Sequence, residues 1–68
     1  LINPFKVLWF DNVWAVFNNS GQLQIQHSQV LDLGITNAEV LDVARENNSL
    51  YLLTNTSIQI FEISKIPF

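Results

Sequence analysis

The side chains of this 68-residue chain that could act as acids, bases or metal ligands are few and widely spaced. His27 is the only histidine, and there is no cysteine. Metal sites need several ligands, and a general base needs an orienting partner. The pattern therefore predicts no catalytic residue, no bound metal and no cofactor. The six carboxylates are dispersed, at Asp11, Asp32, Glu39, Asp42, Glu46 and Glu62.

For each of these candidate residues, a structural role is favoured over a functional one. His27 follows the polar positions Gln22, Gln24 and Gln26, so we expect it at a strand end near solvent. The only two glycines, Gly21 and Gly34, cannot form a phosphate-binding loop and are expected at a hairpin turn and a strand exit.

Asp32 and Asp42 interrupt apolar strands, in Val-Leu-Asp-Leu and Val-Leu-Asp-Val. A carboxylate buried in such a strand must be hydrogen-bonded or paired. We expect both residues to brace turns, which is a structural role and not a catalytic one.

Charge and hydropathy exclude several classes of function. The net charge is −3, and the cations are only Lys6, Arg45 and Lys65. Binding to phosphates needs more positive charge than this, so nucleic-acid contact through this segment is not expected. The longest apolar runs, Val7–Phe10 and Val13–Phe17, are far shorter than the ~20 residues of a membrane span. Without cysteines or a signal peptide, a cytoplasmic or nuclear location is favoured.

Short apolar runs separated by polar turns predict an all-β chain in two units. The first unit, residues 1–34, has strands expected at 6–10, 13–17, 22–26 and 29–33. The second unit, residues 35–68, has strands expected at 39–44, 50–53 and 57–63. The only helical alternative covers Asn37–Asn47, where Asn37 could cap a helix.

The two units repeat one another. Lys6–Phe10 can be laid over Glu39–Val43, 33 residues apart, and Leu23–Ile25 over Ile58–Ile60, 35 residues apart. Trp14–Val16 then matches Tyr51–Leu53. Each unit reads as one strand, then a strand with both faces apolar, then a strand with one polar face.

A sheet with two apolar faces needs neighbours on both sides, as in a propeller. We therefore predict short antiparallel strands forming roughly two four-stranded blades of a β-propeller, part of a larger ring. The hydrophobic share, 49% of the residues, is more than a body of this size easily hides, which also favours an incomplete assembly.

The segment from Val40 to Pro67 resembles a degenerate WD40-like blade: Val-Leu-Asp-Val-Ala, a polar turn, Leu-Tyr-Leu-Leu, then Ser-Ile-Gln-Ile-Phe-Glu-Ile. From Ile58 to Pro67 it is also similar to the LVIVD-type repeat. The Gly-His pair of WD repeats is absent, and Phe61-Glu62 stands in place of Trp-Asp. The resemblance implies a scaffold that holds protein partners together on a propeller, few of whose relatives are enzymes.

Aromatic side chains supply the candidates for contact with a partner. Trp14 lies in the most apolar strand and is expected in the core. Phe5, Trp9 and Phe68 are expected to pack on something outside this segment.

The leading functional hypothesis is a non-catalytic protein-interaction scaffold segment of a β-propeller subunit in a larger complex. Its partners would be other protein chains or the remainder of its own propeller. One alternative is the propeller portion of an enzyme or of an accessory subunit of a modifying enzyme. A second alternative is a secreted or surface β-domain, because three glycosylation sequons begin at Asn18, Asn47 and Asn55.

Overall fold

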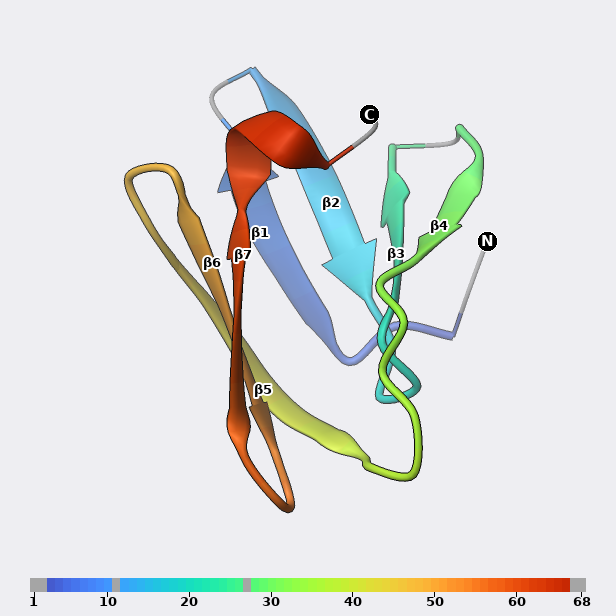
Figure 1. Ribbon diagram of the computed structural model, residues 1–68. Helices are drawn as coiled ribbons and strands as arrows, with labels where there is room; N and C mark the ends of the chain where they lie inside the picture. Colours follow the sequence, from blue (N-terminus) through green and yellow to red (C-terminus); the bar gives the residue numbers. More distant parts are fainter. Residues whose placement is uncertain (1–2, 11, 27, 67–68) are drawn as a thin grey trace.

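A computed structural model describes residues 3–10, 12–26 and 28–66, and it is built of two antiparallel sheets (Figure 1). Sheet A has four strands in the order β1-β2-β3-β4: β1 Lys6–Phe10, β2 Val13–Phe17, β3 Gln22–Ile25 and β4 Val30–Asp32. Sheet B has three strands in the order β5-β6-β7: β5 Val40–Glu46, β6 Ser49–Thr54 and β7 Ile58–Glu62. A short 3-10 helix, η1 Ile63–Lys65, follows β7. The all-β prediction is confirmed, including strand and not helix at Val40–Glu46.

Each sheet is a meander whose strands pair in sequence order, because short turns join them. In the turn between β2 and β3, Asn18 Oδ1 accepts hydrogen bonds from the backbone N–H groups of Ser20 (3.1 Å) and Gln22 (3.0 Å). Between β6 and β7, Thr54 Oγ1 accepts from the N–H groups of Thr56 and Ser57. These side chains satisfy backbone donors that the strand ladders leave unpaired.

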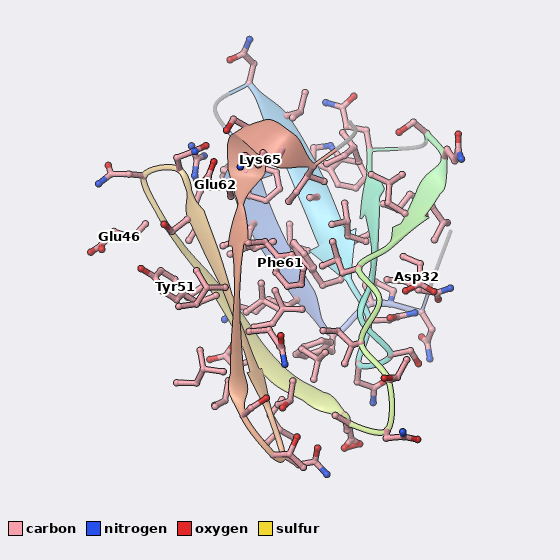
Figure 2. All side chains as sticks on the ribbon, viewed as in Figure 1. Asp32, Glu46, Tyr51, Phe61, Glu62 and Lys65 are labelled. Atoms are coloured by element: carbon pink, nitrogen blue, oxygen red, sulfur yellow. The ribbon has the colours of Figure 1, made fainter. Side chains whose placement is uncertain are left out.

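The two sheets face each other across one hydrophobic core. The inner face of sheet A comprises Leu8, Phe10, Val13, Ala15, Phe17, Leu23, Ile25 and Leu31. The inner face of sheet B comprises Val40, Val43, Arg45, Leu50, Leu52, Gln59 and Phe61. Figure 2 shows Phe61 pointing between the sheets and Tyr51 pointing away from them. Within the core, the rings of Phe10 and Phe17 meet edge to face, 6.3 Å between centroids.

Two expectations about burial are wrong. Gln24, expected on a wet face, is only 7% exposed, and its Nε2 donates to the carbonyl of Ser28 at 2.7 Å. This hydrogen bond allows the amide to be buried. Trp14, expected in the core, is half-buried, because the pairing of Trp9 with Trp14 places both on the face of sheet A that turns away from the core.

The register of the repeat also differs from the sequence alignment. The β1–β2 hairpin closes at the pair Phe10–Val13, and the β5–β6 hairpin closes at the pair Glu46–Ser49. Because these pairs are equivalent, each residue of β1 and β2 corresponds to the residue 36 positions later in β5 or β6. The offset of 33 expected for Lys6–Phe10 is therefore wrong, and the expected match of Trp14–Val16 with Tyr51–Leu53 is wrong by one residue. The register shift between Val40 and Asp42 is a local irregularity at the start of β5 that an ungapped alignment cannot represent. In β3 and β7, Leu23 does align with Ile58, because Phe17 pairs with Leu23 and Leu53 pairs with Ile58.

Gly21 is required where the chain turns into β3. Its φ is +84°, and a Cβ built there would lie 2.7 Å from Cγ1 of Ile35. Gly34 has a similar φ of +78° but open space around it. Alanine at Gly34 therefore introduces only the strain of a left-handed backbone, whereas alanine at Gly21 introduces that strain and a steric clash.

We expect Gly34→Ala to destabilise the β2–β3–β4 region by about 1–2 kcal/mol through its backbone alone. Gly21→Ala carries the same cost and also displaces Ile35, for a total of about 2–5 kcal/mol. Amide hydrogen exchange followed by mass spectrometry at low protein concentration measures the loss of protection over residues 14–25. Equal losses in the two variants would contradict the close packing of Ile35 on Gly21.

Candidate interaction surface

In the part of the chain that the structure describes, the fold does not gather the candidate acids, bases and metal ligands into one site. Among residues 3–10, 12–26 and 28–66, no group of three or more His, Cys, Asp or Glu side chains could hold a metal ion. His27 and Asp11 lie outside the described residues, as does Phe68. The described part of the chain also contains no helix long and apolar enough to cross a membrane.

Asp32 ends β4 and organises the exit from it. Its Oδ1 accepts a hydrogen bond from the backbone N–H of Gly34 at 2.8 Å, and the side chain is exposed. This Asx contact lets the chain turn at Gly34, where φ is positive.

Asp42 lies at the irregular start of β5 and not in a turn, and it is exposed. Because β5 is an edge strand of sheet B, the carboxylate lies at the edge of the sheet. There it accepts the backbone N–H of Val43 at 2.8 Å and forms an ion pair of 3.0 Å with Lys6 Nζ in β1. The hydrogen bond from Lys6 lowers the pKa of the Asp42 carboxyl, with smaller contributions from the Val43 N–H and from the charge of Lys6.

Arg45 is a second link between β5 and β1. Its Nη1 donates to the carbonyl of Trp9 at 3.2 Å, and its guanidinium carbon lies 5.4 Å from the centre of the Phe10 ring. The sequence interpretation missed this role because it placed Arg45 in the polar connection after β5. The signal that could have revealed it is alternation with Val43, which directs Arg45 inward, where its apolar stem packs and its head reaches the rim.

The outer face of sheet B is an exposed apolar surface, composed of Ala44, Tyr51, Leu53, Ile58 and Ile60. Ile58 and Ile60 are 62% and 64% exposed. A hollow of about 280 Å³ lies over this face, bordered by Asp42, Val43, Ala44, Tyr51, Leu53 and Ile58. The carboxylates Glu46 and Glu62 lie beyond the apolar residues at one end of the same face, so the surface has an apolar centre and a charged rim.

The outer face of sheet A has an apolar part, composed of Val7, Trp9, Trp14, Val16 and Val30, next to the polar residues Gln22, Gln24 and Asp32. Val16 and Gln24 are buried within it. Trp9, one of the residues expected to contact a partner, is 65% exposed on this face. Phe5, another of them, is 43% exposed just before β1. The molecule thus has a covered core between its sheets and an apolar surface on each side.

The three sequons occupy turns that use their asparagines differently. Asn18 Nδ2 donates to Gln22 Oε1 at 2.8 Å, and Asn55 Oδ1 accepts the backbone N–H of Glu39 at 3.0 Å. Asn47 is exposed in the β5–β6 turn, with a left-handed φ of 54°.

Comparison of the chain with family models, with curated proteins and with solved structures finds no match. The functional interpretation therefore rests on the geometry of the two sheets.

We expect Lys6→Gln to raise the pKa of Asp42 toward its ordinary value of 3.8, because the cation that favours the carboxylate is lost. In the unsubstituted chain, the folded-state pKa lies below the unfolded one. The contact therefore favours folding above the unfolded pKa, and this contribution is lost as the pH falls through the lowered folded value. NMR titration of the Asp42 carboxyl carbon at low salt measures the shift.

Lys65→Gln is the matched control, because Lys65 lies near Glu62, 3.9 Å away, and not near Asp42. It should leave the Asp42 titration unchanged. Both groups of the Lys6–Asp42 pair are partly exposed, so added salt should reduce the difference. An Asp42 pKa insensitive to Lys6→Gln would contradict the link between β1 and β5.

Proposed function

We propose that this chain is a non-catalytic protein-interaction scaffold, formed by two adjacent blades of a β-propeller within a larger assembly. The observation that carries the proposal is the pair of exposed apolar outer faces. Monomeric proteins rarely leave such surfaces uncovered, and they mark sites of protein contact.

The arrangement of the two sheets supports the propeller interpretation. Both sheets are meanders in sequence order, and their first strands, β1 and β5, lie together through Lys6–Asp42 and Arg45–Trp9. Blades of a propeller are radially repeated antiparallel sheets around a central channel, so equivalent strands of neighbouring blades adjoin. The core between the sheets corresponds to the packing of one blade on the next.

The amount of exposed apolar surface explains why a binding partner would stabilise the chain. Fully burying a side chain such as Val or Ile contributes about 1.5–3 kcal/mol. Among the described residues, the four most exposed large apolar side chains are Val7, Trp9, Ile58 and Ile60, divided equally between the two outer faces. Covering them would contribute on the order of 5–10 kcal/mol, comparable to the whole stability of a small domain, about 5–15 kcal/mol.

We expect the isolated chain to bind the dye ANS, to self-associate as its concentration rises, and to lack a sharp, reversible thermal transition as a monomer. The double substitution Ile58→Ser/Ile60→Ser should lower ANS binding and self-association while far-UV circular dichroism keeps its β signal, since both side chains point away from the core. Fluorescence and sedimentation equilibrium provide the two readouts.

Leu52→Ser is the control for the interior, because Leu52 is fully buried between the sheets. It should abolish the β signal instead of improving solubility. A monomeric chain that unfolds sharply and reversibly and does not bind ANS would overturn the proposed scaffold function.

A further inference from the structure

The registers of the two sheets show which faces are equivalent. Residues of β1 and β2 match residues 36 positions later in β5 and β6, and residues of β3 match residues 35 positions later in β7. Under this relation, Val7 matches Val43 and Gln24 matches Gln59. The outer face of sheet A thus corresponds to the inner face of sheet B.

The inner face of sheet A likewise corresponds to the outer face of sheet B. Phe17 matches Leu53, Leu23 matches Ile58, and Ile25 matches Ile60. The two sheets therefore pack front to back, with one kind of face against the other kind. Within the chain, the equivalent of the outer face of sheet B therefore packs against the equivalent of the outer face of sheet A.

We infer that the outer face of sheet B docks on the outer face of sheet A of a second copy of this chain, repeating between molecules the contact made within one. This inference rests on the proposed scaffold function and names its partner. The contact is heterologous, because different faces of the two copies meet. Copies would therefore add in one direction, to a ring if the rotation closes and to a filament if it does not.

Charges at the first strands fit this arrangement. Within one chain, Lys6 of sheet A pairs with Asp42 of sheet B. These two residues are equivalent under the 36-residue relation, so the contact between copies brings Asp42 of one copy to Lys6 of the next. Lys6 and Asp42 then alternate in sign along the stack, so at this position opposite charges meet.

Trp9 of sheet A is equivalent in position to Arg45 of sheet B, which is a hydrogen-bond donor. Within the chain, Arg45 donates from sheet B to the backbone carbonyl of Trp9 in sheet A. Trp9 is the equivalent of Arg45, and its indole carries an N–H. In the contact between two copies, Trp9 therefore takes the place that Arg45 has within the chain. A large apolar side chain with one hydrogen-bond donor is typical of the centre of an interface.

Two variants, each blocked on one face, test the direction of assembly. Val7→Lys adds a charge to the outer face of sheet A, and Ile60→Lys adds one to the outer face of sheet B. Each variant alone should sediment as a monomer, because assembly needs both faces. An equimolar mixture should form a species of twice the monomer mass and no larger, since one competent face of each kind remains. Gln29→Lys, at an exposed position outside both faces, is the control and should assemble like the unsubstituted chain.

Self-association of Val7→Lys alone would show that two sheet B faces meet, and would overturn the head-to-tail contact while leaving the scaffold function standing. A mixture that remains monomeric, although the unsubstituted chain associates, would also overturn it. If either variant loses its β signal in circular dichroism, the pair Trp9→Lys and Ile58→Lys repeats the test at neighbouring exposed positions of the same faces. Failure of the unsubstituted chain to associate at all would count against both proposals.

Discussion

The structure depends on burial of apolar surface between two sheets that are apolar on both faces. The core formed by Phe17, Leu23, Leu50 and Leu52 excludes water from one face of each sheet. On the other face of each sheet, large apolar side chains remain exposed, among them Trp9 and Ile60. A small body with one covered interface and two uncovered ones is stable only to the extent that the single interface outweighs the conformational entropy of the chain. This constraint links the fold to the proposed role.

Polar contacts determine how the sheets are placed, whereas apolar burial holds them together. Lys6, Arg45 and Asp42 connect β1 to β5 at the edge of the core. Exposed ion pairs contribute little free energy. Their geometry is nevertheless directional, so we interpret them as fixing the mutual position of strands that the apolar core alone would allow to slide.

Most of the strands could be predicted from the sequence, because short runs of Val, Ile, Leu and aromatic residues between Asn, Ser, Thr and Gly turns favour extended backbone. The faces were harder to predict. The strand around Gln24 has clean polar–apolar alternation, yet Gln24 is buried because it finds the carbonyl of Ser28. Arg45 was placed outside the strand because the true end of β5 depends on pairing with β6, which no local pattern records. The register shift beside Asp42 depends on the same pairing. Asp32 is different, since its contact with Gly34 spans only two residues and is visible as a local Asx motif.

Tryptophan emission offers the most direct measurement of the central claim that the outer faces are covered by other protein. In a Trp14→Phe variant, Trp9 is the only remaining tryptophan, and it lies on the outer face of sheet A. If that face is an interaction surface, its emission should be that of a water-exposed indole at low concentration and should shift to the blue as the chain associates. Emission that stays at the wavelength of an exposed indole while the sedimenting mass rises would contradict the account.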